Sequence, residues 1–533
     1  MRILFVILLT CLLVAPAGCQ KKKSSKKKSA SSARASRTPT RKRTTKSGSP
    51  RGRLNLSSNP PEQIIFVPPA GSGNTIVLPE VKKILDMVKQ ASQDAPTTVI
   101  WLLDTTASNA PLLNNVTTQL GYFFQQAGNE QASQDLLTAI VSFAAEGRWI
   151  TEQPTADKTI LSDALTQLGQ DSSGHEQAFT VLGEVIDKSI HYRIEDQRQV
   201  VIVVVTDEAG DDDDRADAVL AATTRYAIPI YVIGPAAPFG RSALLADSVE
   251  VNSGAEAEDG WKPIYQGPES RHSERLQLPF AGFGMNMERV HSGFGPFSWE
   301  RVCRASGGSY LAVVMPGYST NMMRDLQSGG TYLMGRLDPE QMPRYTPDYI
   351  SESAYRQLLS DNAARRALHE AAKLPPVGLL DRPQTTFNVR SEAQLANDLG
   401  KAQLAAARLE PAIQKLHTTL KSGEQDRQTL SRPRWQAGYD LAMGRTLAAR
   451  ARIEGYNAML ALLKRGKVFE NPGSTTWILV PDDTLNVGSN YERMVDGARN
   501  YLQGVIGDHK GTPWARVAAR ELETKLGWKW TEQ

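Results

Sequence analysis

Two apolar segments of this chain each end in an aspartate that is followed by further oxygen-bearing side chains. The candidate ligands are Asp104, Thr106 and Ser108 after the first segment and Asp207 after the second. Carboxylate and hydroxyl oxygens are the ligands that hard divalent cations prefer. In open α/β sheets, ligands bind outside the carboxyl ends of the strands. The spacing therefore predicts a site for Mg²⁺ or Mn²⁺, with Ca²⁺ as a third candidate.

The elements that must position these side chains alternate between strands and helices. We expect strands at residues 98–103, 139–143, 200–206, 228–234 and 309–314. We expect helices at 112–126, 160–168, 177–188 and 215–226, preceded by a helix at 78–91 and a short strand at 63–68. Strands that are apolar throughout are typical of a parallel sheet covered on both faces. The prediction is an α/β fold with a doubly wound, mostly parallel, Rossmann-like sheet.

This part of the chain resembles the von Willebrand factor A domain. Residues 104–108 read Asp-Thr-Thr-Ala-Ser, which resembles the D-x-S-x-S motif of the family's metal-ion-dependent adhesion site. Thr159 matches the family's loop threonine by its spacing to an Ala-Leu pair, and residues 206–208 resemble its T-D-G element, with Glu208 in place of the glycine. The resemblance covers residues 98–315. The long insertion and the Gly-Gly-Ser-Tyr turn at 307–310 loosely resemble exported bacterial proteins of the planctomycete type. It implies a metal site formed by Asp104, Thr106, Ser108, Thr159 and Asp207.

Two carboxylates and three hydroxyls neutralise and coordinate a doubly charged cation only in part. The resemblance implies that an open position remains for an acidic side chain of a protein partner, and the charge balance agrees with this. By analogy with weak extracellular calcium sites, we expect a Kd for the metal alone on the order of 10⁻⁵–10⁻³ M. Two alternatives stay open: the aspartates only cap the turns that follow them, or the fold carries no working site.

The first residues resemble an export signal. Arg2 precedes an apolar run, residues 3–14, that is too short to span a bilayer comfortably. Small residues before Cys19 resemble a bacterial lipobox, which predicts a signal peptide at 1–19 and a lipid on Cys19. Ordinary cleavage after Ala17 is the alternative. We expect a lipoprotein anchored to a membrane of the cell envelope, with a periplasmic or secreted protein as the alternative.

Residues 20–61 contain fourteen Lys or Arg, no acidic residue and almost no large apolar one. This composition cannot bury a core and predicts a disordered linker. Without these fourteen and Arg2, the 61 basic residues fall to 46 against 57 acidic ones, so the rest of the chain carries a net charge of about −11. The linker has no aromatic residue on which bases could stack, so no nucleic-acid partner is expected. Two of the three cysteines lie in the leader, which excludes an intrachain disulfide framework in the mature protein.

Two features near the proposed site have open interpretations. A segment at 236–296 is too long for an ordinary connection and leaves the sheet at its carboxyl edge. It is either a lid or specificity element or a decoration of the domain. The four consecutive aspartates at 211–214 are either a second cation site or an acidic start to the next helix, where negative charge meets the positive end of the helix dipole.

The chain after residue 315 is predicted to be helical. We expect a connecting helical region at 316–390, an antiparallel, coiled-coil-like helical hairpin at 391–466, and a helix pair at 467–533. Apolar residues recur at alternating spacings of four and three between 395 and 420, which is the pattern of a heptad seam, and Pro411 predicts a break in it. Residues 62–97 are the lead-in to the A-like domain.

These features favour a non-enzymatic adhesion or scaffold protein that binds a partner's acidic side chain through its metal. The sequence contains no Walker phosphate loop, no G-x-S-x-G elbow and no H-E-x-x-H zinc pair. The alternatives are a cell-envelope hydrolase and an accessory component of an envelope assembly machine. Neither the partner's identity nor the oligomeric state follows from the sequence.

Overall fold

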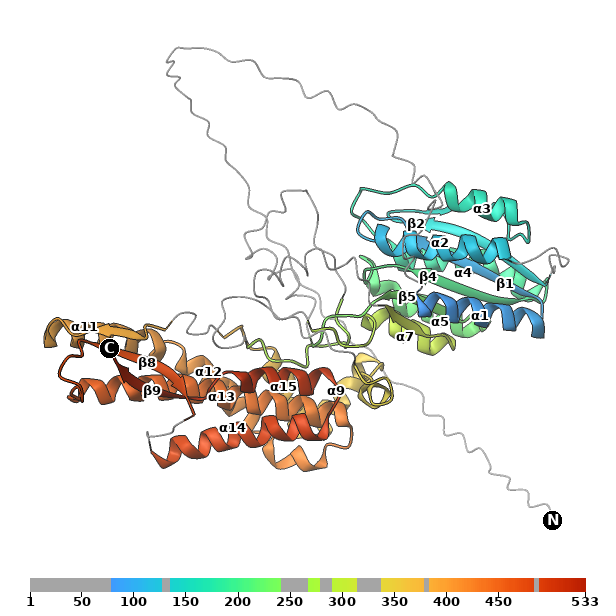
Figure 1. Ribbon diagram of the computed structural model, residues 1–533. Helices are drawn as coiled ribbons and strands as arrows, with labels where there is room; N and C mark the ends of the chain where they lie inside the picture. The colour runs from blue at the N-terminus through green and yellow to red at the C-terminus, as the bar shows by residue number, and fades with distance from the viewer. Residues whose placement is uncertain are drawn as a thin grey trace, which may run out of the picture. The chain divides into compact units, whose positions relative to one another are not determined.

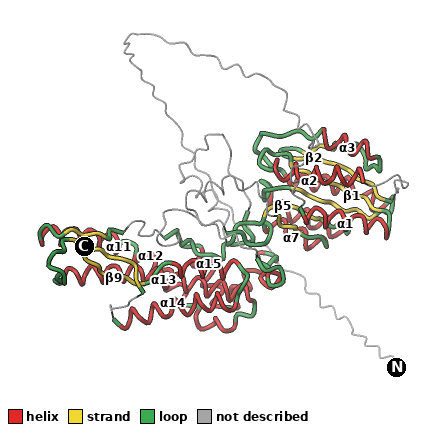
Figure 2. Tube along the Cα trace, viewed as in Figure 1, coloured by secondary structure: helices red, strands yellow, loops and turns green. Residues whose placement is uncertain are grey.

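The computed structural model describes residues 78–126, 135–240, 267–278, 290–313, 337–377, 383–483 and 488–533 (Figure 1). The expected signal peptide, Cys19, the basic linker, the strand expected at 63–68 and parts of the 236–296 insertion lie outside these residues. Within them, no helix is long and apolar enough to cross a membrane. The described residues form an α/β domain and a helical module, defined here as residues 337–533, that carries a small sheet (Figure 2).

A six-stranded sheet in the order β3-β2-β1-β4-β5-β6 forms the centre of the α/β domain. All neighbouring strands are parallel except the edge pair β2 and β3. The predicted fold class, a doubly wound and mostly parallel sheet, is therefore confirmed. The strands are β1 (Thr97–Asp104), β2 (Leu136–Phe143), β3 (Gly147–Trp149), β4 (Gln199–Val205), β5 (Ile230–Pro235) and β6 (Tyr310–Val313).

Helices cover both faces of this sheet because successive side chains of each buried strand point to opposite faces. In β1, Val99, Trp101 and Leu103 pack into one core, whereas Ile100 and Leu102 pack into the other. The first core is closed by α1 (Pro79–Asp94), α2 (Ala110–Gln126) and α3 (Lys158–Thr166). The second is closed by α4 (Ala178–Ile194), α5 (Ala216–Tyr226) and α7 (Phe297–Ser306). Since α1 contributes four apolar side chains to the first core, this core begins before residue 98.

The helical module is built around α13 (Pro433–Lys464), which is buried on nearly every side. Two helices, α11 (Glu392–Ala407) and α12 (Glu410–Lys421), run antiparallel to it, and Pro411 in the first turn of α12 separates them. Gln403 of α11 reaches the Asn457 carbonyl near the end of α13, whereas Tyr439 near its start donates to the Leu420 carbonyl of α12. The remaining helices are η3 (Met342–Tyr345), α9 (Glu352–Asp361), α10 (Ala363–Ala372), η4 (Glu424–Thr429), α14 (Ser489–Asp508) and α15 (Pro513–Glu523).

A three-stranded antiparallel sheet completes the helical module. Its strands are β7 (Thr386–Asn388), β8 (Thr476–Asp482) and β9 (Gly527–Glu532). The apolar residues 477–480, followed by Pro481, predict a short strand or an extended segment, and β8 covers them. β9 follows directly on α15, in a stretch whose alternation of Trp528 and Trp530 with polar residues is the period-two signal of a half-buried strand.

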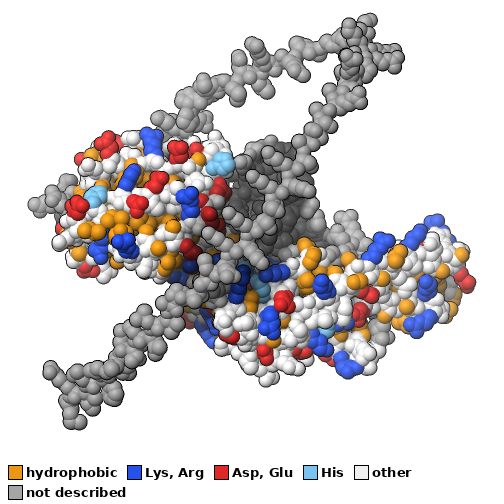
Figure 3. All heavy atoms as spheres, turned by 180° about the vertical axis from the view of Figure 1, so that it is seen from behind, with side chains coloured by type: hydrophobic (Ala, Val, Ile, Leu, Met, Phe, Trp, Pro, Cys, Tyr) orange, Lys and Arg blue, Asp and Glu red, His pale blue; other side chains and the backbone are white. Residues whose placement is uncertain are grey.

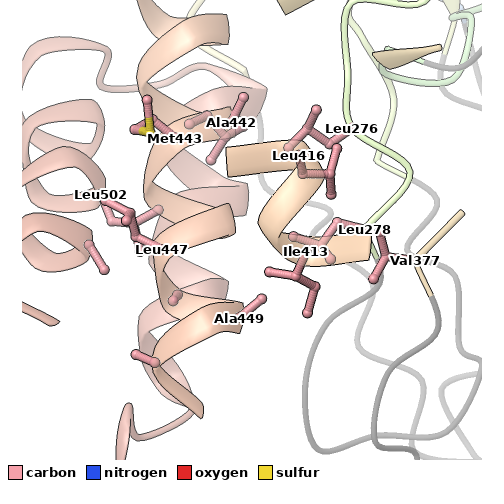
Figure 4. Close-up of a cluster of buried hydrophobic side chains, with 14 of the residues drawn as sticks. Leu276, Leu278, Val377, Ile413, Leu416, Ala442, Met443, Leu447, Ala449 and Leu502 are labelled. Carbon is pink, nitrogen blue, oxygen red and sulfur yellow. The ribbon is translucent and has the colours of Figure 1, made fainter. Parts of the chain in front are cut away.

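Several apolar residues of the described part of the 236–296 insertion join the core of the helical module. Leu276 and Leu278 lie beside Ile413 and Leu416 of α12 and across from α13 (Figure 4). Phe239 at the start of the insertion packs edge-on against Trp514 of α15, with ring centroids 4.7 Å apart. These described residues are packed in a core, and the two interpretations of the insertion, a lid or specificity element and a decoration of the domain, both stay predictions.

Candidate metal-binding site

Two adjacent parallel strands, β1 and β4, bring the two predicted aspartates to the same edge of the sheet. Their register pairs Leu103 with Val205, so both strands end at the same level. Asp104 is the last residue of β1, and Asp207 follows β4 by two residues. Both carboxylates are buried, with 0% and 1% of their residue surface exposed. The topology therefore places Asp104 and Asp207 together although 103 positions separate them in the sequence.

Two hydroxyl side chains connect these aspartates. The backbone N–H and the hydroxyl of Thr106 donate to Oδ1 of Asp104 at 2.8 and 2.7 Å. The Ser108 hydroxyl lies 3.2 Å from that of Thr106 and donates to Oδ1 of Asp207 at 3.3 Å. Asn109 closes the turn by donating from its side chain to the Asp104 carbonyl at 2.8 Å. Four of the five predicted metal ligands thus form one connected group of oxygen atoms.

The structure adds a carboxylate that sequence reasoning missed. Glu176 precedes α4 and is 2% exposed. The Thr206 hydroxyl lies 2.7 Å from Oε1 of Glu176 and 3.1 Å from Oδ2 of Asp104. One hydroxyl proton therefore lies between two carboxylate oxygens and compensates their charge only in part. No spacing rule singles out Glu176, because its segment, from 167 to 177, is an irregular connection between α3 and α4.

Several acidic side chains lie close together at this edge of the sheet, and their pKa values are raised. Burial, and next the charge of Asp104, raise the pKa of Glu176 well above its usual value. Burial likewise raises the pKa of Asp104. The pKa of Glu208 rises to about 8 because burial is reinforced by Asp207, Asp104 and Asp211. Among the described residues, no Lys, Arg or His forms an ion pair with Asp104, Glu176 or Glu208.

The residues at this edge fit a divalent cation by their chemistry. They supply hard oxygen donors, and Oε2 of Glu176 is a buried polar atom without a hydrogen-bond partner. A cation would compensate the like charges that burial makes unfavourable. Within the described residues, no group of three or more His, Cys, Asp or Glu side chains has the geometry of a metal site. Hydroxyls, water or a partner would therefore have to supply the remaining ligands.

The fifth predicted ligand, Thr159, lies apart from the hydrogen-bonded group. It is exposed in the first turn of α3, where Oδ1 of Asp157 caps the helix by accepting from the N–H groups of Thr159 and Ile160 at 2.8 and 3.3 Å. No hydrogen bond joins Thr159 to Asp104 or Asp207 within the part of the chain that the structure describes. The segment after α3 does approach the site, since the Asp171 N–H donates to the Thr105 carbonyl at 2.8 Å.

The aspartates at 211–214 have separate roles. Oδ1 of Asp212 accepts the N–H of Phe179 at 3.0 Å, and its Oδ2 accepts the N–H and hydroxyl of Thr180 at 2.6 and 2.5 Å, so Asp212 caps α4 from another segment. Asp211 accepts the N–H of Glu176 at 3.0 Å. Asp213 and Asp214 begin the short 3₁₀ helix η1 (Asp213–Arg215), which leads into α5. The acidic start of a helix was expected, whereas the cap on α4 was not.

No family model and no curated protein sequence matches this chain. Solved structures do. The conserved hypothetical protein BatB from Bacteroides thetaiotaomicron is similar at 14% identity over 44% of this chain and 98% of that one, with a TM-score of 0.24. The VWA domain of SpRpn10 is similar at 14% identity over 26% of this chain and 75% of that one, with a TM-score of 0.20.

A further similar structure is the ArnB paralog VWA2 from Sulfolobus acidocaldarius, at 11% identity over 27% of this chain and 36% of that one, with a TM-score of 0.19. The fold is von Willebrand A-like. This likeness concerns the mostly parallel sheet with helices on both faces. Identities this low concern the fold alone and assign no activity.

Proposed function

We propose that this chain is a protein-interaction or scaffold protein whose α/β domain binds a divalent cation, Mg²⁺ or Mn²⁺, at the edge of the sheet. Asp104, Thr106, Ser108 and Asp207 hold the cation, and Thr159, which lies outside this hydrogen-bonded group, is the predicted fifth ligand. The cation then offers an open position to an acidic side chain of a protein partner. The proposed activity is binding of a partner, without chemical turnover.

One observation carries the proposal: two buried carboxylates from neighbouring strands are linked through two hydroxyls, with no cationic side chain ion-paired to Asp104 in the described structure. Burying a carboxylate without compensation is costly, so a sheet edge of this composition is suited to an external cation. The ligand set leaves the cation with residual positive charge, which favours an anionic partner group.

Calorimetric titration of the full chain with Mg²⁺ and Mn²⁺ tests the metal site. We expect saturable binding with a Kd on the order of 10⁻⁵–10⁻³ M. Asp104→Asn and Asp207→Asn should each abolish it, because each variant removes a charge and keeps the shape. Asp187→Asn, on the exposed surface of α4, is the matched control for the loss of one acidic side chain. Equal affinity in all four proteins would refute the site.

The hydrolase alternative makes a different prediction. An envelope hydrolase would turn over a model phosphate or ester substrate, and some activity would survive Asp104→Asn if the reacting groups lay elsewhere. The binding proposal expects no turnover by the wild-type chain under conditions in which the metal is bound. Turnover by the wild-type chain that tracks its metal occupancy would replace the proposal with an enzymatic one.

We further propose that the chain is exported and anchored through a lipid on Cys19. The small residues before this cysteine support the proposal. Mass spectrometry of the mature amino terminus in a bacterial host checks it: a lipid-modified Cys19 is expected, and Cys19→Ser should release the protein from the membrane fraction. An unmodified terminus after Ala17 would show ordinary signal cleavage.

A further inference from the structure

The turn that carries Asp207 is supported by a segment that comes 60 residues later in the chain, at 267–268. Gly267 adopts a left-handed backbone with φ +65°, and a Cβ at this position would lie 2.7 Å from Cβ of Ala209. Only a glycine can therefore approach the turn this closely without displacing it. Ala209 lies two residues after Asp207, so the position of Gly267 limits where the turn can lie.

The same segment is held against α7, which contacts the turn from a second side. The Phe297 N–H at the start of α7 donates to the Pro268 carbonyl at 2.8 Å. Trp299, which is fully buried, donates from Nε1 to the Glu208 carbonyl at 3.2 Å and stacks on Phe179 with ring centroids 4.3 Å apart. The residue directly after Asp207 is thus fixed by a hydrogen bond from a side chain that packs in the domain core.

The next residues of the segment are clamped by an arginine of α13. Arg434 donates from one terminal nitrogen to Oε1 of Glu269 at 2.8 Å and from Nε to Oε2 of Glu274 at 2.7 Å. The side chains of Glu269, Glu274 and Arg434 are 0%, 7% and 1% exposed. Glu269 also accepts the Gly240 N–H at 3.2 Å. Aromatic side chains, among them Trp435 and Trp514, line the small pocket beside these groups.

We propose that Arg434 is a positioning residue for the candidate metal site. It acts through Glu269, whose neighbours Pro268 and Gly267 support the turn after Asp207. The inference rests on the proposed function for its effect on metal affinity, but the mechanical link from α13 to the turn does not depend on a bound metal. The helical module then helps to fix the position of the turn at the sheet edge.

The clamp can be removed without leaving a buried charge uncompensated. Removing Arg434 alone would strand two buried glutamates, whereas replacing a whole buried ion cluster by neutral groups of similar volume is tolerated. The test variant therefore combines Glu269→Gln, Glu274→Gln and Arg434→Met. Arg434→Lys retains the charge but not the fork that bonds two carboxylates, and is the conservative variant. The control is Arg427→Gln with Asp440→Asn, which removes a bidentate ion pair between η4 and α13 that is distant in sequence from the insertion.

Hydrogen exchange of the metal-free full chain is measured first, followed by Mg²⁺ calorimetry. In the triple variant, we expect amides 206–212 to exchange at least about tenfold faster and the Mg²⁺ Kd to rise by about five- to tenfold. Arg434→Lys should lie between the triple variant and the wild type. The control should leave both quantities unchanged. Gly267→Ala perturbs the opposite end of the link and should also raise exchange at 206–212, with exchange in α13 unaltered.

The outcomes separate the link from the metal site. If amides 206–212 are unaltered in the triple variant while those at 267–278 exchange faster, the positioning role is refuted. If the control raises exchange at 206–212 equally, the effect is one of general stability and the role is also refuted. If exchange responds as expected but the wild-type chain binds no Mg²⁺, the link stands and the proposed metal function fails. If the triple variant does not fold, Arg434→Lys and Gly267→Ala decide by the same exchange criterion.

Discussion

Two regions of this molecule bury carboxylates and compensate them in opposite ways. In the helical module, Glu521 is 3% exposed and lies 2.8 Å from Arg445, with Arg452 on its other oxygen. Burial raises the pKa of Glu521, but the two guanidinium groups outweigh burial, and the pKa is lowered overall. At the edge of the α/β sheet, burial raises the pKa values of Asp104 and Glu176, and no described cationic side chain is ion-paired with either.

This difference indicates which buried carboxylates are compensated by the protein itself and which are available to bind a proton or a cation. An arginine supplied by the chain itself is always present, so the charge of Glu521 is permanently compensated and helps to fix the packing of α13. A sheet edge that lacks such an arginine depends on a proton or a cation from solution. On the face drawn in Figure 3, exposed acidic and basic side chains are interspersed, and such surface pairs contribute little. The buried groups therefore dominate the expected effects.

The largest expected effect comes from removing the shared acid of the helical module. Glu521→Leu leaves Arg445 and Arg452 buried without their counter-charge, because both donate to Glu521 in the native chain. Breaking a buried ion cluster at one partner costs about 3–5 kcal/mol of unfolding free energy. Denaturant unfolding of the wild type and the variant measures the loss.

The matched control is Glu454→Leu, which removes an acid from the surface of α13, where it pairs with Arg450 four residues earlier. An exposed pair at this spacing contributes about 0.3–0.5 kcal/mol. Losses of similar size in the two variants would contradict the view that burial makes the difference between these acids.

Binding of a cation at the sheet edge should stabilise the folded chain by less than the loss expected for Glu521→Leu. A ligand that binds only the folded state adds about 2.7 kcal/mol at a free concentration one hundred times its Kd. Saturating Mg²⁺ should therefore raise the unfolding temperature of the wild-type chain, and Asp207→Asn should remove that increase. Differential scanning calorimetry in Mg²⁺ and in a chelator measures it. An equal increase in the variant would mean that Mg²⁺ acts elsewhere on the chain.

A third prediction compares Asp212 and Asp214, which belong to the same run of aspartates but have different structural roles. Asp212→Ala removes the acceptor for the first N–H groups of α4, and losing a helix cap costs about 0.5–2 kcal/mol. Asp214→Ala changes the start of η1, where the side chain makes no described hydrogen bond, and should alter stability by less than about 0.5 kcal/mol. Thermal unfolding in a chelator measures both variants, and a larger loss for Asp214→Ala would reverse the assignment.

The sequence predicts the parts of this molecule that repeat a simple pattern. The strands at the centre of the sheet are largely apolar, so β1, β4 and the aspartates at or shortly after their ends follow from the local sequence pattern. The hydroxyls of Thr106 and Ser108 follow from their spacing to Asp104. The break in the hairpin follows from Pro411, since proline cannot continue a helix through its interior.

Other parts depend on contacts between distant segments, which no local pattern records. Glu176 lies in an irregular connection and meets Asp104 only because β1 and β4 are neighbours. The buried Glu269 and Glu274 look like ordinary surface acids until Arg434, about 160 positions later, is placed beside them. β7 has only three residues, too few for a period-two pattern to be distinguished from a loop. These misses share one cause: the interaction that fixes each residue is long-range.

The smallest expected effect concerns a buried histidine of the helical module, where the unfavourable charge would be positive. His369 in α10 is 7% exposed, and its ring centroid lies 5.0 Å from that of His272 and 5.9 Å from that of Tyr355. Burial is the main cause that lowers the pKa of His369 to about 4. The positive charges of Lys373 and His272 lower this pKa further, whereas the charge of Glu352 opposes the shift. The unfolded chain has a histidine pKa of about 6.5 and therefore binds more protons between these values. The stability that neutral His369 contributes is complete above about pH 6.5 and is lost as the pH falls towards 4. His369→Gln should make the unfolding free energy less dependent on pH in this window than it is in the wild type. Denaturant midpoints at half-unit steps of pH measure this, and identical slopes in the two proteins would show that His369 is protonated without cost where it lies.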